Sequence, residues 1–319
     1  MIEIHRYTAA YHRDWNDFVS ESSNGTFLFL REYMEYHADR FTDYSLLVYD
    51  GNKLLALLPA NRSGDVLYSH AGLTYGGLIG PNRDTTGAGS GNRRAQVLEI
   101  MRSIADFLKK ERFVKWVYKC IPHIYHRYPS ESDLYALFRL EARLMGRNIS
   151  STVQLDNPIR LRADRRSRMK KAEQAGLRVV ETTDFSPFWK VLDANLQERF
   201  HVKPVHSLDE IELLHSRFPD RIRHFVTMRG DETLAGSVIY DTGIVAHAQY
   251  TSASAEGKAS GALDLLYARL IGEVFADRKW FDFGQSTEDM GHYLNEGLIA
   301  QKEGFGGRGV AYDIYEITL

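Results

Sequence analysis

The chain has 319 residues, 44% of them hydrophobic and 26% charged, and this length predicts two domains of ordinary size. Its 40 Lys and Arg residues against 42 Asp and Glu leave a formal charge of -2, so the overall balance does not indicate a nucleic-acid-binding protein. The single cysteine, Cys120, excludes an internal disulfide and the cysteine-rich zinc modules. Because no signal-peptide core and no run of about 18 apolar residues is present, we expect a cytoplasmic protein.

The same order of predicted elements occurs twice along the chain. Residues 46–56 and 225–235 each consist of two apolar runs around a turn, at Gly51 and Gly230, a pattern typical of β-hairpins because glycine takes the positive φ that the turn needs. Three predicted elements follow in each half: a third strand (65–69 and 243–250), an amphipathic helix (94–111 and 258–276) and a returning strand (113–119 and 280–283). The sequence therefore predicts an α+β protein of two structurally similar domains, residues 1–155 and 156–319.

A strongly basic segment lies where the two predicted domains meet. Residues 160–171 carry seven positive side chains and one acid, Asp164, and helix formers continue to Gly176, which is placed to end a helix in the left-handed conformation. One interpretation is a solvated basic helix. The other is an anion-facing wall, formed by Arg160, Arg162, Arg165, Arg166, Arg168, Lys170 and Lys171.

A loop with two glycines, at residues 254–262, connects a predicted strand to the second amphipathic helix. Such a loop directs backbone N–H groups and the positive end of the helix dipole toward one place, which suits a phosphate or pyrophosphate. Its spacing matches neither the Walker motif nor the dinucleotide fingerprint, and an ordinary helix N-cap is the alternative. The residues of this predicted phosphate site are Glu256, Gly257, Lys258, Ala259, Ser260, Gly261 and Ala262.

A meander followed by such a loop and helix resembles the core of the GNAT acyltransferases. The pyrophosphate-binding pattern of that family, Arg/Gln-x-x-Gly-x-Gly/Ala, is similar to residues 258–263, with Lys258 in place of the first residue and Leu263 where a small residue is expected. The resemblance implies that acyl-CoA is the donor and that its pyrophosphate binds this loop.

Further motifs follow in the C-terminal part: Asp282-Phe283-Gly284 at the end of a predicted strand, then Ser286-Thr287, Gly297-Leu298, Lys302 and Phe305-Gly306. Together with the basic segment before residues 172–177, they resemble the FemAB-like, double-GNAT superfamily, over residues 160–319 by motif and over the first half by architecture. The resemblance implies two tandem GNAT-like domains, each a mixed twisted sheet flanked by helices, with a degenerate N-terminal domain on the acceptor side and the donor on the C-terminal domain. The best-known members transfer amino acids from aminoacyl-tRNA to peptidoglycan precursors, and many relatives look like acyl-CoA-dependent N-acyltransferases of cell-surface polysaccharide pathways.

The same resemblance implies roles for two residues of this C-terminal part. Lys302 would stabilise the oxyanion or hold an anionic part of a substrate, because a positive group acts most strongly on developing negative charge in a water-poor cleft. Asp282 would face the same cleft as a second catalytic residue. Gln301 stands where the family often has phenylalanine, and the alternative for Lys302 is a surface lysine paired with Glu303.

A polar segment, residues 198–206, precedes the capping-box pair Ser207 and Glu210, which predicts the start of a helix. An acyltransferase needs a base for the acceptor amine, and histidine suits that task near neutral pH, so His206 is the predicted base and His201 a further candidate, although a surface or structural histidine is the alternative for each. The predicted substrate-binding residues are Arg199, Lys203, Tyr250, Gln285 and Ser286.

These observations favour an N-acyltransferase that moves an acyl group from acyl-CoA to an amine, such as an amino sugar or a cell-surface polysaccharide or peptidoglycan precursor. One alternative is an aminoacyl-tRNA-dependent peptidyltransferase, with the basic segment contacting tRNA phosphates. The other is a catalytically silent binding or scaffold protein, since the phosphate loop is imperfect. We expect no metal, because His123 and His126 lack a nearby Cys or carboxylate partner, and we interpret residues 87–91 as a lid loop.

Overall fold

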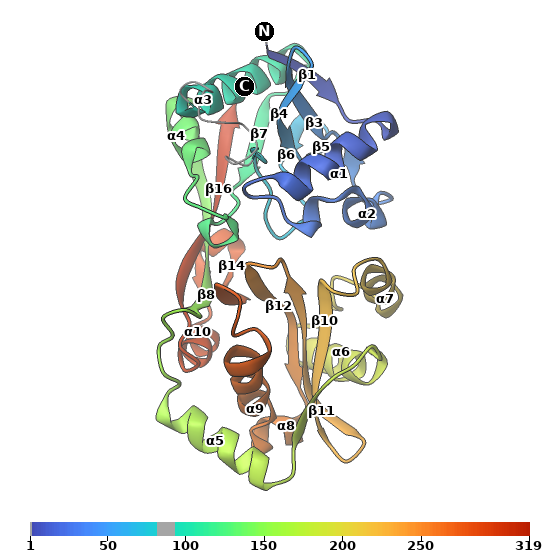
Figure 1. Cartoon of the computed structure of the whole chain (residues 1–319), viewed down its shortest axis with the longest axis vertical. Coiled ribbons are helices and arrows are strands. Elements are labelled where there is room, and N and C mark those ends of the chain that lie inside the picture. The colour runs from blue at the N-terminus through green and yellow to red at the C-terminus, as the bar shows by residue number, and fades with distance from the viewer. Residues whose placement is uncertain (1, 82–92) are drawn as a thin grey trace. The chain divides into compact units, whose positions relative to one another are not determined.

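The computed structural model describes residues 2–81 and 93–319, so the predicted lid loop lies outside the described residues. The chain divides into two compact units: unit 1 is Met1–Asn148, Glu288–Tyr293 and Ala311–Leu319, and unit 2 is Ile149–Thr287 and Leu294–Val310. This division differs from the expected boundary between residues 155 and 156. Two long strands, β8 (Arg143–Gln154) and β16 (Arg308–Thr318), contribute residues to both units, so the last residues of the chain belong to unit 1 (Figure 1).

Unit 1 contains two sheets where the sequence predicts one meander. The predicted hairpin at Gly51 joins β3 (Leu46–Asp50) to β4 (Lys53–Leu58), and β1 (Ile2–Arg6) completes a three-stranded antiparallel sheet. Pro59 follows β4 and lacks the N–H that a continuing ladder would need, and the chain then passes to the second sheet. That sheet has the order β2 (Thr42–Asp43), β5 (Asn61–Ser63), β6 (Val66–Tyr68), β7 (Lys115–Lys119), β16 and β8.

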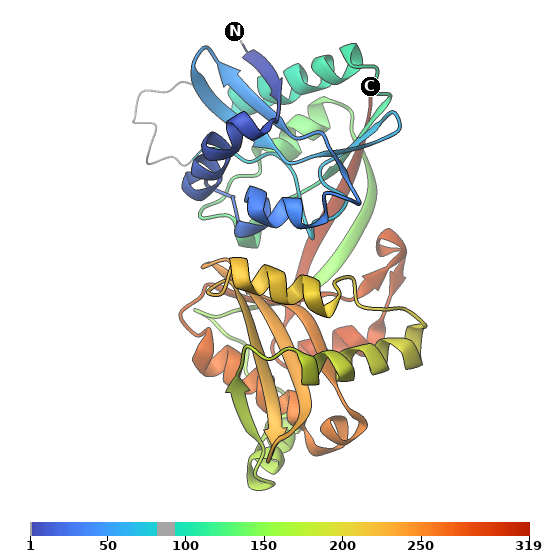
Figure 2. The ribbon, with the colours of Figure 1, turned by 90° about the vertical axis from the view of Figure 1, so that its right-hand side faces the viewer.

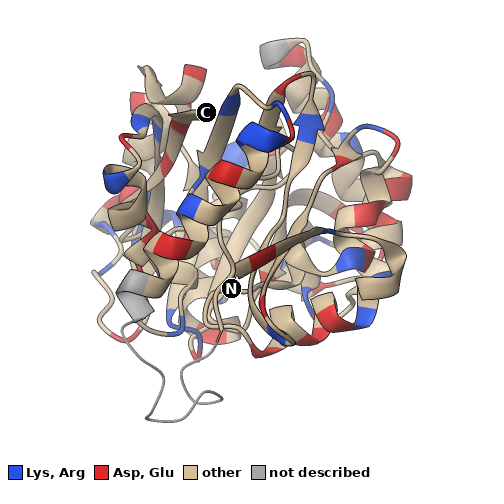
Figure 3. Cartoon of the chain, turned by 90° about the horizontal axis from the view of Figure 1, so that it is seen from above, with Lys and Arg blue, Asp and Glu red and all other residues tan. Residues whose placement is uncertain are grey.

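Among its described residues, unit 1 has four α-helices: α1 (His12–Glu21), α2 (Arg31–Met34), α3 (Arg93–Lys110) and α4 (Ser132–Arg139). Helix α3 matches the predicted amphipathic helix, and its buried residues Met101, Ile104 and Leu108 pack in one core with Trp116 of β7. Lys and Arg are interspersed with Asp and Glu in the view from above, in keeping with the small net charge (Figure 3). A short two-stranded sheet is formed by β14 (Thr287–Glu288) and β15 (Tyr293–Leu294).

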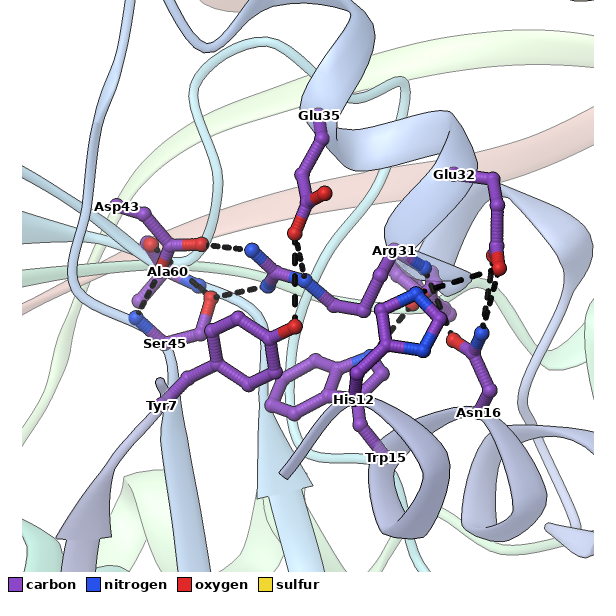
Figure 4. Close-up of polar contacts among 11 residues, drawn as sticks. Tyr7, His12, Trp15, Asn16, Arg31, Glu32, Glu35, Asp43, Ser45 and Ala60 are labelled. Atoms are coloured by element: carbon purple, nitrogen blue, oxygen red, sulfur yellow. Dashed lines mark hydrogen bonds and ion pairs between the residues drawn. The ribbon is translucent and has the colours of Figure 1, made fainter. Parts of the chain in front are cut away.

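A buried arginine of α2, Arg31, forms polar contacts that connect this helix to the strand region of unit 1 (Figure 4). Its guanidinium forms ion pairs with Glu35 and Asp43 and donates to Ser45 Oγ, and it lies 3.6 Å from the ring centroid of Tyr7. All three nitrogens of the guanidinium therefore have partners, as a buried charge requires. We interpret this cluster as structural.

The same eleven-stranded sheet of the described residues continues from β8 into unit 2, in the order β13 (Trp280–Gln285), β12 (Val245–Ala253), β11 (Glu232–Asp241), β10 (Ile222–Arg229) and β9 (Arg178–Glu181). The predicted hairpin at Gly230 joins β10 to β11, and Gly230 has a φ of 55°. Strands β9 to β12 are antiparallel, whereas β12 and β13 are parallel because the helical segment between them crosses over (Figures 1 and 2).

Helices cover both faces of this sheet: α5 (Ala163–Gln174), α6 (Ser186–Phe200), α7 (Leu208–Arg217), α8 (Ala255–Ser260), α9 (Ala262–Arg269) and α10 (Glu296–Glu303). Neighbouring residues of a strand point to opposite faces, so His224 and Phe225 of β10 mark the two sides. His224 contacts Phe188 of α6, whereas Phe225 shares a core with Leu266 and Tyr267 of α9. The predicted fold class, α+β with mixed sheets flanked by helices, is confirmed.

The helix predicted over residues 258–276 is interrupted. Gly261, with a φ of 79°, separates α8 from α9, and a π-helical turn (Leu270–Val274) follows. The predicted packing face is nevertheless present, since Leu266, Tyr267 and Leu270 are buried against the sheet. No helix within the described residues has the length and hydropathy to cross a membrane.

Candidate functional site

Strands β12 and β13 of unit 2 lie side by side only where they begin. Their parallel register covers residues 245–247 and 280–282 and ends there, although β12 continues to Ala253 and β13 to Gln285. Strand β12 carries an irregularity against β11, next to Ala248. Strand β13 stays paired with β8 from Trp280 to Gln285, with a register shift between Asp282 and Gln285. Because a bulge bends its strand, the two strands diverge beyond His247 and Asp282.

A cavity of about 630 Å³ occupies the place where these strands separate. It is lined by both strands and by α6, α9 and α10, so helices from opposite faces of the sheet contribute to it. Its volume lies in the range of small-molecule sites. The lining residues from the two strands are Ala248, Gln249, Thr251, Ser252, Ala253, Phe283 and Gln285.

Lys302 is the buried cation of this cavity. It lies on α10, is 8% exposed, and donates from Nζ to the carbonyl oxygens of Gly284 at 2.8 Å and Gln285 at 2.7 Å. An ammonium has three N–H donors, so two carbonyls leave one N–H for a ligand. Burial lowers the pKa of Lys302 to about 8, while the charge of Asp282 acts in the opposite direction, so the side chain is mostly protonated at pH 7.

Two other polar pairs line the cavity. The hydroxyls of Tyr267 and Thr251 lie 2.5 Å apart, and burial raises the pKa of Tyr267 to about 12, which keeps that phenol neutral. Lys258 donates from Nζ to Asn195 Oδ1 at 2.6 Å. Lys258 is thus the member of the predicted phosphate loop that reaches the cavity wall, together with Gln285 from the predicted substrate set.

Asp282, predicted to be catalytic, is fully buried and does not line the cavity. Its carboxylate accepts hydrogen bonds from Ser150 Oγ, from Thr152 Oγ1 at 2.9 Å, and from His247 Nδ1 at 2.8 Å. His247 is a residue that the motifs do not mark. The available signal was a histidine inside the predicted strand 243–250, beside the strand that ends at Asp282.

His206 and Tyr250, predicted separately, lie together but away from the cavity lining. Tyr250 Oη accepts from the His206 backbone N–H at 3.1 Å and lies 2.5 Å from its Nδ1, and both residues are buried. The capping box of Ser207 and Glu210 is confirmed at the start of α7. Lys203 is exposed.

The other two predicted substrate residues are placed as follows. Ser286 is buried, and its Oγ has no hydrogen-bond partner among the described residues. Arg199 lies in the last turn of α6, and its side chain is outside the described part of the chain.

The predicted phosphate loop is folded as a short helix and a glycine link. Ser254 caps α8 by accepting from the Gly257 N–H, and Glu256 forms an ion pair with Arg229. A Cβ at Gly257 would lie 2.2 Å from the Leu234 carbonyl oxygen. Gly257 therefore allows α8 to pack closely on β11. This is a structural role, whereas the sequence pattern predicted that Gly257 binds a phosphate.

Helix α5 packs against the second part of this loop. A Cβ at Gly261 would lie 2.8 Å from the Arg168 carbonyl oxygen, so the α5 backbone closely approaches the N-terminus of α9. Asp264 in the first turn of α9 is 2% exposed and accepts from Arg165 and Arg168, each at 2.9 Å. Two of the seven predicted anion-binding residues thus share one carboxylate within unit 2, and Arg162 pairs with Asp164.

The remaining basic side chains of this segment, Arg160, Arg166, Lys170 and Lys171, are exposed. Gly176 has a φ of 75° and ends α5 as predicted. No group of three or more His, Cys, Asp or Glu residues in the described chain is arranged to hold a metal ion.

Comparisons with known proteins concern the domain family and the fold. Residues 160–293 match the family model of an acetyltransferase (GNAT) domain. The fold resembles the crystal structure of FemX, with a TM-score of 0.68 and 11% identity over 99% of this chain and 97% of that chain. No curated protein matches the sequence.

Two further solved structures share the fold. One is the C-terminal domain of a protein described as a lysylphosphatidylglycerol synthetase, from Agrobacterium fabrum, with a TM-score of 0.62 and 13% identity over 98% of this chain and 93% of that one. The other is L-PGS from Bacillus licheniformis, with a TM-score of 0.60 and 13% identity over 95% and 90% of the two chains. The predicted GNAT resemblance is confirmed for residues 160–293 by the family model, and the FemX-like fold extends over 99% of this chain.

Proposed function

Because the chain has the FemAB-like, GNAT-type fold, we propose that it is an N-acyltransferase that moves an acyl group from acyl-CoA to an amine. One observation carries the proposal: the cavity between the diverging ends of β12 and β13, with the buried ammonium of Lys302 in its wall. Separated strands offer unpaired backbone groups to a ligand, and a buried cation offers charge stabilisation, which are two requirements for acyl transfer.

In this proposal the acyl carbonyl of the donor lies beside Lys302. The N–H of Lys302 that is not used by Gly284 and Gln285 donates to the carbonyl oxygen as negative charge develops there. The two backbone carbonyls hold the ammonium in place before the reaction, so no reorganisation is needed. Acceptors implied by the family resemblance are an amino sugar or a cell-surface polysaccharide or peptidoglycan precursor, with unit 1 on the acceptor side.

A second donor class, aminoacyl-tRNA, is favoured by a specific observation. The predicted pyrophosphate loop has little room, since α5 lies against Gly261, and Arg165 and Arg168 both pair with Asp264. The exposed Arg160, Arg166, Lys170 and Lys171 remain for phosphate contacts along the same segment. In a third reading, a binding protein without catalysis, the cavity would take a ligand without turnover.

A thermal-shift screen with acetyl-CoA, longer acyl-CoAs, free CoA and deacylated tRNA separates these proposals, because a ligand that binds the folded state raises its Tm. We expect stabilisation by an acyl-CoA that exceeds stabilisation by free CoA. Stabilisation by tRNA alone, weakening steeply with salt, would move the proposal to the second donor class.

A matched pair of variants locates the bound donor. Lys258→Ala removes a cation from the cavity wall, whereas Lys279→Ala removes a cation that lies outside the cavity lining of unit 2. We expect the first to reduce the shift given by acyl-CoA and the second to leave it unchanged. Equal shifts in both variants would argue against this cavity as the donor site, and thiol release on mixing acyl-CoA with amines then tests turnover directly.

A further inference from the structure

The diverging strands β12 and β13 carry a second polar pair, His247 and Asp282, in addition to the contacts of Lys302. We propose that His247 accepts the proton of the acceptor amine and that Asp282 positions it. This inference rests on the proposed acyl transfer. It changes the role that the sequence motif gives to Asp282 and replaces His206 as the base.

Asp282 is held too completely to contact a substrate. Its side chain is fully buried, Oδ1 accepts from Ser150 and Thr152 and from the Gly284 N–H at 3.3 Å, and Oδ2 faces His247 Nδ1 at 2.8 Å. A carboxylate with this many donors stays where it is and orients its neighbours. Asp282 is therefore a positioning residue.

The contact with Asp282 fixes the tautomer of His247. Because the carboxylate oxygen accepts, Nδ1 carries the proton, and Nε2 is left with a free electron pair. Among the described side chains, Asp282 alone hydrogen-bonds this ring. His206, the base predicted from sequence, contacts the phenol of Tyr250 through Nδ1, whereas His247 contacts a carboxylate through Nδ1.

His247 does not line the cavity itself, but it adjoins the part of β12 that does. It is the last residue of β12 that pairs with β13, and the next two residues, Ala248 and Gln249, line the cavity. Its Cε1, between the two ring nitrogens, is 3.5 Å from the position of a Cβ on Gly284, whose carbonyl binds Lys302. His247 and Lys302 thus both form hydrogen bonds with the same short segment of β13, residues 282–285.

The proton balance of the reaction can be written for a thioester donor. The acceptor ammonium gives one proton to His247 Nε2, and the resulting amine forms the C–N bond with the acyl carbon. As the C–S bond breaks, the second proton on that nitrogen passes to the leaving thiolate. The imidazolium then returns its proton to solvent, so the products are an amide, a thiol and one proton.

The test measures thiol release from acetyl-CoA with glucosamine, glycylglycine or cadaverine, from about pH 5 to about pH 9, a window that spans histidine titration. His247→Gln is compared with His215→Gln, a matched control, because His215 belongs to the same unit and also has its Nδ1 occupied, by the Ile222 carbonyl oxygen at 2.7 Å. The titratable groups near His247 are Asp282 on β13, Tyr240 opposite it on β11, and Lys302 on α10.

We expect His247→Gln to lower kcat by about 100-fold or more and to abolish the acidic limb of the pH profile, while His215→Gln keeps both. Asp282→Asn should also lower kcat, because an amide allows the wrong tautomer. Equal profiles for His247→Gln and the wild type would overturn the inference. If wild type and His215→Gln both release no thiol above background, the proposed acyl transfer fails and the base fails with it.

Nitrogen-15 NMR of the histidines in the wild type keeps the inference testable if His247→Gln does not fold. We expect His247 to carry its proton on Nδ1 in the neutral form. A proton on Nε2 would overturn the proposal, since that nitrogen could then accept nothing.

Discussion

Nζ of Lys302 lies 2.7 Å from the carbonyl oxygen of Gln285, a residue of the strand that diverges from β12. The contact places a helix side chain against the backbone of a cavity wall, and it fixes the direction of the remaining N–H. This relationship distinguishes Lys302 from a surface lysine, although Glu303 follows it in the sequence.

Lys302→Ala should lower kcat by about 100-fold with little change in donor affinity, if the ammonium stabilises charge that develops in the transition state. Steady-state kinetics and donor titration check this, with Lys279→Ala as the control for loss of a lysine elsewhere in unit 2. A raised acceptor KM with kcat within a few fold would assign Lys302 to acceptor binding instead. Unchanged kinetics would remove it from the site.

The charge of Lys302 should limit activity at high pH. Its pKa is lowered to about 8, so the ammonium is present below that pH and is lost as the pH rises through it. Between pH 7 and pH 9 the charged fraction falls from about nine-tenths to about one-tenth. We therefore expect kcat at saturating substrates to fall above about pH 8, and a kcat that stays level up to about pH 10 would contradict this.

Gly284→Ala should reduce activity more than stability alone explains. Gly284 has a φ of 76°, a conformation that costs an alanine about 1–2 kcal/mol, and its carbonyl holds Lys302. Gly230→Ala is the matched control, because its φ is 55° and nothing lies within 4 Å of its added Cβ. Both variants should lose similar Tm, whereas only Gly284→Ala should lower kcat; equal kcat losses would speak against a role for the Gly284 carbonyl.

Leu270→Ala should destabilise unit 2 by about 2–5 kcal/mol, the usual cost of such a cavity at a fully buried position. Leu213→Ala, at a leucine that is 41% exposed, should change the free energy of unfolding by about 0.5 kcal/mol or less. Denaturant titration of the two variants checks the comparison. A similar loss in both would mean that the predicted packing face does not stabilise the unit.

Elements that depend on neighbours in sequence could be predicted, and those that depend on distant partners could not. The turns at Gly51 and Gly230 and the capping box at Ser207 follow from local backbone needs, so the sequence identifies them. The break after β4 and the insertion of β16 beside β7 depend on pairings between remote segments. A hydrophobic pattern indicates that a strand exists and not which strand lies next to it.

The candidate site also contains residues that could be predicted from the sequence and contacts that could not. Lys302 could be predicted from the motif that contains it, because a family resemblance carries residue positions with it. The contact of His247 with Asp282 joins two strands that a helical crossover separates in the sequence. Hydrophobic periodicity therefore could not predict this contact. The packing of α5 against Gly261 could not be predicted for a related reason, because it arises from a segment nearly a hundred positions earlier, at Arg168.

The path of β16 also bears on how the protein is made. Tyr315 and Glu316 pair with Tyr118 and Val117 of β7, so the larger sheet of unit 1 receives its inner strand from a segment that is translated after most of unit 2. Domains generally fold as units, with the N-terminal one first during synthesis. The sheet of unit 1 therefore cannot be completed until unit 2 has been translated, and until then the edge of β7 that β16 covers lacks this partner strand in the nascent chain.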